Sequence, residues 1–242
     1  MSMIEIKGLT KHFGKHVAVD GMDLSIEKGE LFGLLGVNGA GKTTAIRMLS
    51  CLTAPTAGDA LLNGHSIRTD AAGVKASIGI SPQTTAVAPN LTVRENLDFM
   101  ARVYGRTAAE AAARAEEIIQ QYGLSEVAER RAKVLSGGWQ RRLSIAMAVI
   151  ADPPILFLDE PTLGLDVLAR RELWRAIEQM KGNTTVILTT HYLEEAEALC
   201  DRIAIMTMGH IRATGTADEL KALAGASNFE DAFVHIAEGG LS

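Results

Sequence analysis

The sequence predicts an α/β fold with a mostly parallel sheet, and two observations support this. Short apolar segments alternate with helical stretches in the second half of the chain. Nearer the N-terminus, an apolar segment runs into a glycine-rich loop that is followed by a helix. Strands that alternate with helices at this spacing favour a buried parallel sheet, because helices must cover its faces.

The first 35 residues read as short strands and turns. Segments 4–6 and 22–26 alternate apolar and polar residues and are separated by glycines, which is typical of antiparallel strands joined by tight turns. We therefore expect an N-terminal antiparallel β subdomain. Residues 31–35 are apolar and lead into the glycine-rich loop, and residues 43–52 have helical character.

Residues 91–150 are predicted to form an inserted helical subdomain, because segments 108–114 and 116–119 have high helix propensity. Three apolar strands follow at 155–158, 186–189 and 203–206, with a helix at 168–180 between the first two. These elements predict one domain over residues 1–223. Its β subdomain and core occupy about 1–90 and 151–223, and residues 224–242 form a short C-terminal extension.

Composition and charge exclude several classes of protein. A net charge of -5 and a pI near 5.7 argue against a nucleic-acid partner. The apolar stretches, such as 143–151, are shorter than the roughly 18 to 20 residues that cross a bilayer. Glu5 and Lys7 interrupt any secretory leader, so we expect a cytoplasmic location. Cys51 and Cys200 lack a metal-binding spacing and are expected to be small core residues.

The glycine-rich loop, GVNGAGKTT, matches the phosphate-binding pattern G-x-x-x-x-G-K-[ST] between a strand and a helix. Its glycines allow backbone N–H groups to approach phosphate oxygens, and the helix N-terminus adds partial positive charge. Lys42 is expected to reach the terminal phosphates and Thr43 to bind Mg²⁺. The alternative is a glycine-rich turn with a surface lysine. The predicted nucleotide-binding residues are Gly36, Val37, Asn38, Gly39, Ala40, Gly41, Lys42, Thr43 and Thr44.

Two carboxylates follow the apolar segment 155–158. Asp159 ends a buried strand, where an unpaired carboxylate is costly, so a metal ion or its water would explain it. Glu160, one residue later, could polarise an attacking water and so catalyse ATP hydrolysis. The alternative for Glu160 is a carboxylate at a helix start or on the surface.

Four motifs in order resemble the nucleotide-binding subunits of ABC transporters over nearly the whole chain. They are GVNGAGKTT, LSGGWQRRL, ILFLDEPTLGLD and the pair Thr190-His191. The resemblance implies an ATPase with a P-loop NTPase core, an antiparallel β subdomain and an inserted helical subdomain. The stretches SPQTTAVAPNLTVRENL, THYLEEAEALCDRIAIM and NFEDAFVHI are most similar to the motor subunits of ABC-2-type exporters, including those of drug resistance.

The resemblance also implies roles for single residues. Phe13 matches the aromatic residue that stacks on adenine, although taken alone it reads as a core residue. Gln83 matches the glutamine that touches Mg²⁺ or the attacking water. Asp159 and Glu160 match the metal-associated aspartate and the catalytic glutamate. His191 matches the histidine that contacts the γ-phosphate, although a lone histidine at a strand end is usually structural.

Other motif residues are implied to act between two chains. Ser136, Gly137 and Gly138 match the stretch that contacts the γ-phosphate of ATP bound to an opposing subunit. Their hydroxyl and open backbone N–H groups at a helix N-terminus suit an anion. Asp166 matches the aspartate that crosses this dimer interface. Trp139 departs from the usual glutamine or methionine, which leaves open whether it faces the partner or its own helical subdomain.

Together these features predict an ATPase that binds ATP and Mg²⁺ in a head-to-tail dimer of identical or closely homologous subunits. Separate transmembrane permease subunits would place it on the inner face of the cell membrane. The expected function is export of a drug-like or other amphipathic small molecule. One alternative is a soluble ABC-type ATPase that remodels a protein, ribosome or iron-sulfur assembly complex. A small-molecule P-loop kinase is another, but it does not explain Ser136, Gly137 and Gly138.

Overall fold

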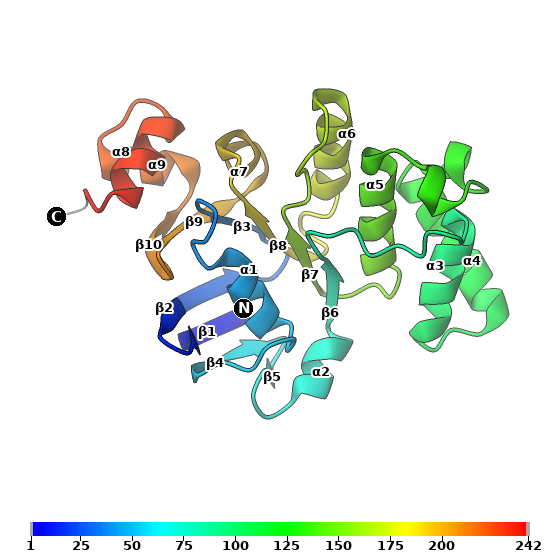
Figure 1. Cartoon of the computed structure of the whole chain (residues 1–242), viewed down its shortest axis with the longest axis horizontal. Helices are drawn as coiled ribbons and strands as arrows, with labels where there is room; N and C mark the ends of the chain where they lie inside the picture. The colour runs from blue at the N-terminus through cyan, green and yellow to red at the C-terminus, as the bar shows by residue number, and fades with distance from the viewer. Residues whose placement is uncertain (1, 241–242) are drawn as a thin grey trace.

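The computed structural model describes residues 2–240 and is built around two β-sheets (Figure 1). Within these residues the larger sheet has six strands in the order β10-β9-β3-β8-β7-β6. All neighbouring pairs are parallel except β9 with β10, which confirms the predicted parallel sheet. The strands are β3 Leu31–Leu35, β6 Ile78–Ser81, β7 Ile155–Asp159, β8 Thr185–Thr190, β9 Arg202–Thr207 and β10 His210–Gly215.

The smaller sheet is antiparallel, as the alternation at 4–6 and 22–26 predicted. Its strand order is β2-β1-β4-β5, and β1 and β2 form a long hairpin. Gly14 takes a left-handed φ of 59° in the tight turn between them. The strands are β1 Ser2–Phe13, β2 His16–Glu27, β4 Ala57–Leu62 and β5 His65–Ser66.

The helices lie between and after these strands. Three of them begin at capping boxes, in which Thr92, Thr107 or Thr216 exchanges hydrogen bonds with a glutamate three residues later. The helices are α1 Lys42–Leu49, α2 Ala71–Ala76, α3 Val93–Val103, α4 Ala108–Gln121, α5 Gly137–Ala148, α6 Val167–Glu178, α7 Leu193–Leu199, α8 Ala217–Ala224 and α9 Phe229–Ala237. Short 3-10 turns occur at Ser125–Val127 and Ala132–Val134.

The first of these helices is shorter than the predicted segment 43–52. Helix α1 ends at Leu49, and Cys51 adopts a positive φ of 55°. The backbone N–H groups of Leu52 and Thr53 both donate to the carbonyl of Arg47 instead of continuing the helix. The chain therefore leaves the helix early and turns toward β4.

Helices α3, α4 and α5 gather at one end of the molecule, drawn in green in Figure 1. Their buried residues, such as Ile118 and Leu143, belong to the same apolar cluster as Leu156 and Leu158 of β7. Alternate residues of the same strand, including Phe157, point into a second cluster with α1 and the antiparallel sheet. The parallel sheet is therefore buried on both faces, and the helical end is continuous with one of them.

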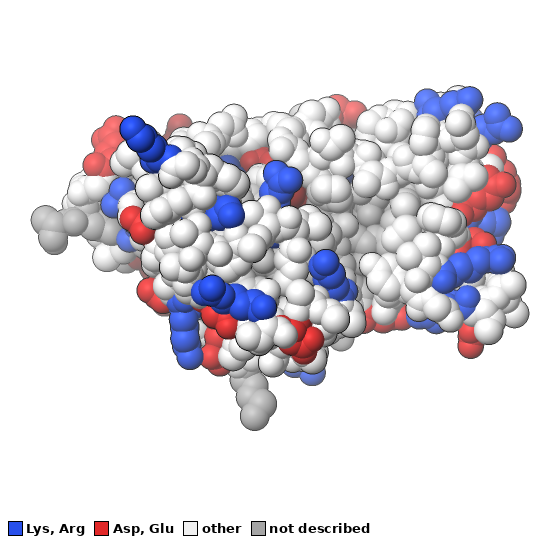
Figure 2. Space-filling model, turned by 60° about the horizontal axis from the view of Figure 1, so that its bottom comes forward, with Lys and Arg blue, Asp and Glu red and all other residues white. Residues whose placement is uncertain are grey.

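Helices α8 and α9 cover the edge of the larger sheet near β9 and β10. Leu220, Phe229 and Ile236 pack in one cluster with Ile203 and Ile205. The proposed boundary between residues 223 and 224 falls in the last turn of α8, and this cluster joins helices from both sides of that boundary. Among the described residues, no helix is both long and apolar enough to cross a membrane. Acidic and basic side chains are interspersed over the face drawn in Figure 2.

Candidate active site

The glycine-rich loop connects β3 to α1, as predicted, and close packing requires glycine at two of its positions, 36 and 41. A Cβ atom on Gly36 would lie 2.2 Å from the carbonyl oxygen of Met206. Gly41, the N-cap of α1, has a φ of 109°, and a Cβ atom there would lie 2.4 Å from the carbonyl oxygen of Ala18. No side chain caps this helix start. The loop can therefore present open backbone N–H groups to an anion.

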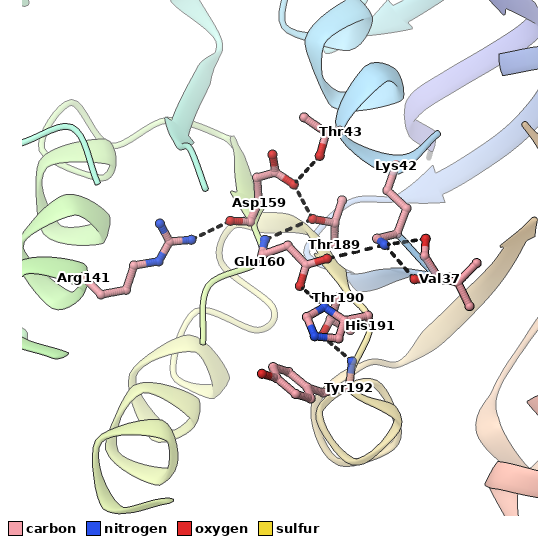
Figure 3. A network of polar contacts seen from close by, with 11 residues as sticks. Val37, Lys42, Thr43, Arg141, Asp159, Glu160, Thr189, Thr190, His191 and Tyr192 are labelled. Carbon is pink, nitrogen blue, oxygen red and sulfur yellow. Dashed lines mark hydrogen bonds and ion pairs between the residues drawn. The ribbon is translucent and has the colours of Figure 1, made fainter. Parts of the chain in front are cut away.

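Lys42 is 5% exposed and points back over the loop, so the alternative of a surface lysine is wrong. Its Nζ donates to the carbonyl oxygens of Gly36 and Val37 at 2.6 and 3.3 Å. The same nitrogen lies 3.4 Å from Oε1 of Glu160 (Figure 3). One cation therefore joins the loop after β3 to the carboxylate that follows β7.

Asp159 ends β7 and is 4% exposed, with its carboxylate held by hydroxyls from two other segments. Its Oδ1 accepts hydrogen bonds from Thr189 Oγ1 at 2.5 Å and from Thr43 Oγ1 at 3.2 Å. Thr189 lies on β8, the strand next to β7. Thr43 and Asp159 thus bring a hydroxyl and a carboxylate together, which are oxygen donors that suit Mg²⁺.

Glu160 is buried and paired with His191, so the alternative of a surface carboxylate is wrong. It is 6% exposed, and its Oε2 lies 2.7 Å from Nδ1 of His191. Its backbone has a left-handed φ of 49°, and its N–H donates to both the carbonyl oxygen and the hydroxyl of Thr189. The side chains of Lys42, Glu160 and His191 converge at the ends of three parallel strands (Figure 3).

A hollow is lined by Lys42 and Glu160. His16 and Ala18 of β2 also line it, and no motif in the sequence pointed to His16. Of the predicted site residues, it is lined by Asn38, Gly39, Ala40, Gly41, Lys42, Thr43, Thr44, Gln83 and Glu160. The structure therefore brings the predicted nucleotide-binding residues 38–44 together with Gln83 and Glu160, whereas Gly36, Val37, Asp159 and His191 are not among the residues that line this hollow.

Phe13 lies beside this hollow and is 52% exposed, so its interpretation as a core residue is wrong. It pairs across the β-hairpin with His16, which lines the hollow. The ammonium of Lys11 lies 5.0 Å from the centre of its ring. An exposed aromatic ring at this place is available to stack on a planar base.

Ser136 and Gly138 do not line the hollow formed by the glycine-rich loop. They line a second hollow between α5 and α6, together with Asp166 and Trp139. Asp166 caps α6, since its Oδ1 accepts from the backbone N–H groups of residues 168 and 169 at 2.9 Å each. Gly138 is packed so closely that a Cβ atom would lie 3.1 Å from Cβ of Ala169. The predicted interchain residues are thus gathered, but at a different place from the loop of their own chain.

Trp139 contacts both its own helical subdomain and the surface beside Ser136. Its ring packs against the apolar cluster of the helical end and also lines the second hollow. The guanidinium carbon of Arg142 lies 4.7 Å from the ring centre, and the same arginine forms an ion pair with Glu172 of α6. The tryptophan therefore belongs partly to its own helical end and partly to the surface beside Ser136.

Two buried charged residues near the site were missed by sequence reasoning. Arg141 of α5 is 4% exposed and binds backbone carbonyls of the site loops. Glu195 of α7 is fully buried, and its Oε1 accepts from Nε1 of Trp174 at 3.0 Å. Among the described residues its Oε2 has no hydrogen-bond partner. Burial raises the pKa of the Glu195 carboxyl, and the nearby hydroxyls of Thr190 and Thr162 together with the hydrogen bond from Trp174 offset only part of this effect.

Comparison with known proteins identifies the family. A family model described as "ABC transporter" matches residues 19–163, more than half of the chain. The daunorubicin/doxorubicin resistance ATP-binding protein of Streptomyces peucetius is 43% identical over 225 residues, which are 93% of this chain and 68% of that protein. The linearmycin resistance ATP-binding protein of Bacillus subtilis is 42% identical over 219 residues, 90% of this chain and 70% of that protein.

Solved structures agree with the sequence relatives. An ATP-binding subunit of an ABC transporter superposes with a TM-score of 0.86 at 27% identity and covers 97% of this chain and 99% of its own. A dimeric ATP-binding cassette in a post-hydrolysis state, bound to ADP and Pi, has a TM-score of 0.80 at 26% identity, with 88% and 98% covered. The chain therefore belongs to the ABC transporter family, as one of its ATP-binding, ATP-hydrolysing subunits.

Proposed function

We propose that this chain hydrolyses MgATP in a head-to-tail dimer and so drives export of an amphipathic small molecule through separate membrane subunits. The observation that carries the proposal is the separation of two hollows on one chain. One is lined by the glycine-rich loop and Glu160, and the other by Ser136, Gly138 and Asp166. Each chain thus offers two different halves of a composite site, which a second copy would complete.

Within one chain, the first hollow supplies the groups that hold phosphate. The open N–H groups of the loop and the ammonium of Lys42 would bind the phosphates of ATP. Thr43 and Asp159 would hold Mg²⁺, because Mg²⁺ in nucleotide sites needs only one or two protein oxygen ligands besides the phosphates. Gln83 also lines the hollow and is the third candidate ligand. Bound Mg²⁺ would neutralise charge that develops on the phosphates.

The hydrolytic step is assigned to Glu160. Its carboxylate would take a proton from an attacking water or orient that water, as a general base. His191 would fix the direction of the carboxylate through its 2.7 Å contact and would reach toward the terminal phosphate. Phe13 would stack on the adenine, in agreement with its exposure beside the hollow.

In the dimer, Ser136, Gly137 and Gly138 would receive the terminal phosphate of ATP held by the partner copy. The hydroxyl of Ser136 makes no capping hydrogen bond to α5, so it can serve a ligand. Asp166 would lie at the same interface. ATP would then stabilise the dimer, and its hydrolysis would release the two copies. A dimeric relative with ADP and Pi bound supports this arrangement.

The export assignment is supported by the names of the relatives. Several are resistance proteins for daunorubicin, doxorubicin or linearmycin, and another is a Nod factor export protein of Cupriavidus metallidurans. These names do not favour the alternative of a soluble remodelling ATPase. We therefore place the chain on the inner face of the cell membrane, against permease subunits that provide the transport path.

The test is purification of the chain from membranes, followed by reconstitution with the membrane protein that co-purifies with it. Proteoliposomes that contain both proteins should move a fluorescent amphipathic compound in one direction when MgATP is added. The same vesicles made with Glu160→Gln should not. Failure of the chain to bind any membrane subunit, with stable association to a soluble assembly complex instead, would contradict the export proposal.

A further inference from the structure

The guanidinium of Arg141 is buried, and its four hydrogen bonds all go to backbone carbonyls. Nη1 donates to the carbonyls of Pro82 and Gln83, the second at 3.3 Å. Nη2 donates to Asp159 at 2.5 Å, and Nε donates to Pro161 at 2.9 Å. Figure 3 shows the guanidinium pointing at the carbonyl of Asp159. The rigid fork of an arginine can thus hold two chain segments at a fixed separation.

Three of these acceptors lie in two loops that carry candidate catalytic residues, and the fourth, Asp159, is the last residue of β7. The first loop follows β6 and contains Gln83, and the second follows β7 and contains Glu160. Strands β6 and β7 are parallel neighbours, with Ser81 opposite Leu158. The carbonyls of Asp159 and Pro161, both bound by Arg141, belong to the residues on either side of Glu160.

The backbone of Glu160 needs such support. Its φ of 49° is left-handed, a conformation that is strained for a non-glycine residue and persists only where the surroundings enforce it. Thr189 of β8 holds the N–H of Glu160 on one side. Arg141 holds the two neighbouring carbonyls from the α5 side. Thr189 and Arg141 therefore hold the backbone of Glu160 from two sides.

The charges around Arg141 suit a residue that holds backbone segments in position, and not a residue in an ion pair. Among residues 2–240, no carboxylate lies close enough to Arg141 to form a salt bridge with it. Burial lowers the pKa of Arg141 to about 10, and the charges of Asp159, Glu195 and Glu160 offset part of this effect. The guanidinium stays protonated at neutral pH, and the carbonyl dipoles solvate it. A lysine in this place would have one nitrogen instead of the planar fork of three, so it could not keep all four of these contacts.

The same helix carries the interchain stretch. Helix α5 begins at Gly137, just after Ser136, and a second buried contact joins it to β6, where Ser144 Oγ lies 3.0 Å from Ser81 Oγ. We propose that Arg141 is a positioning residue that joins α5, the Gln83 loop and the Glu160 turn into one unit. Contact between Ser136 and the partner's nucleotide is then coupled to the orientation of Glu160. This inference rests on the proposed function, in which Glu160 activates water.

The test compares Arg141→Lys with Arg114→Lys in the full chain. Arg114 of α4 is a matched control, because its side chain is 14% exposed and its Nε donates to the backbone carbonyl of Ile150 at 3.2 Å, outside both loops. Arg141→Lys should lower kcat roughly 100-fold and leave the Kd for MgATP within about 3-fold of wild type. Arg114→Lys should change both constants by less than about 3-fold.

A second comparison asks whether Arg141 acts through Glu160. In the Glu160→Gln background, Arg141→Lys should lower the residual turnover by less than about 3-fold, because the group that it positions is already gone. A further loss of about 100-fold in that background would overturn the inference, as would equal losses of kcat in Arg141→Lys and Arg114→Lys. Wild-type turnover by Glu160→Gln alone would instead refute the proposed role of Glu160, whatever the arginine variants do.

The control for correct folding is the rise in Tm that MgATP produces, because a misfolded variant would not show it. If Arg141→Lys does not fold, Arg141→Gln takes its place, since its amide retains hydrogen-bond donors without the charge. A folded variant that binds MgATP normally and keeps wild-type kcat would overturn the inference.

Discussion

The ammonium of Lys42 lies 3.4 Å from a carboxylate oxygen of Glu160, and both side chains are almost fully buried. Lys42 is the first residue of α1, after the loop that follows β3, and Glu160 follows β7. Strand β8 separates β3 from β7 in the sheet. Because the phosphates of ATP are negative, a bound nucleotide would compete with Glu160 for the ammonium of Lys42. The carboxylate needed for hydrolysis therefore opposes phosphate binding.

This relationship predicts the behaviour of Glu160→Gln. Loss of the carboxylate charge should leave the Kd for MgATP unchanged or lower, while removal of the general base should reduce kcat by about 10² to 10⁴-fold. The ATP-bound dimer should accumulate, as measured by size-exclusion chromatography with MgATP. Glu117→Gln, which loses only an exposed pair with Arg114 of α4, is the control for kcat. Unchanged turnover in Glu160→Gln would remove Glu160 from the role of base.

Lys42→Ala should have the opposite effect on binding. Loss of one charge-assisted contact to phosphate costs about 1.5 to 3 kcal/mol, which is an increase in Kd of about 10- to 150-fold. The variant should also have a lower Tm without nucleotide, because Glu160 would be left buried without its cation. Titration calorimetry with ATP checks the first effect. Lys181→Ala, at an exposed pair with Asp201, should bind ATP normally. Normal affinity in Lys42→Ala would contradict the phosphate-loop assignment.

Phe13→Ala tests adenine stacking. Stacking of a base on an aromatic ring is worth about 1 to 3 kcal/mol, so the Kd for ATP should rise by at least about 5-fold. The Tm without nucleotide should hardly change, because the ring is 52% exposed and leaves no cavity. Phe99 of α3 is 54% exposed and is the matched control. Equal affinities of Phe13→Ala and Phe99→Ala would exclude a stacking role.

The sequence predicted the glycine-rich loop and the strand-end carboxylates because their chemistry depends on side-chain identity and short spacing. It could not predict the contacts of Arg141, whose acceptors are backbone carbonyls up to 59 positions away. A carbonyl has no residue identity, so a pattern cannot reveal it. Glu195 was missed because it stands in the acidic run LEEAEA, which reads as a solvated face. Only the packing of α7 on the sheet buries it.

Elements that depend on tertiary pairing were also missed. Strands β4 and β5 carry little alternation, and β1 supplies the edge on which β4 pairs. Helix α9 was predicted only as part of a C-terminal extension, although Phe229 and Ile236 bury their side chains against α8 and β9. In both cases the partner that makes the segment stable lies far along the chain, where local periodicity carries no information.

Trp139→Gln tests which contact of the tryptophan matters. Its ring lines the hollow with Ser136 and is also covered by Arg142. If the exposed part meets a second copy, the variant should weaken ATP-dependent dimerisation of the Glu160→Gln protein by about 10-fold, since interface tryptophans often contribute more than 1 kcal/mol. Analytical ultracentrifugation with MgATP measures this. Trp174→Gln, on α6 outside that hollow, is the control. An unaffected dimer would limit Trp139 to packing within the helical end.

Glu195→Gln should change how the stability of the protein depends on pH. Because the folded-state pKa of Glu195 is raised above 4.5, the stability that its neutral form provides is complete below pH 4.5 and is lost as pH rises through the folded pKa. A glutamine in this place does not ionise, so its contribution to stability does not fall as pH rises. In urea unfolding, the free energy of unfolding of the variant should therefore rise relative to that of wild type by about 1.4 kcal/mol per pH unit across this window. Glu197→Gln, at an exposed pair with Lys221, should show no such gain. A difference in unfolding free energy between Glu195→Gln and wild type that stays constant with pH would mean that Glu195 is ionised in the folded protein, with its charge held by groups other than Trp174.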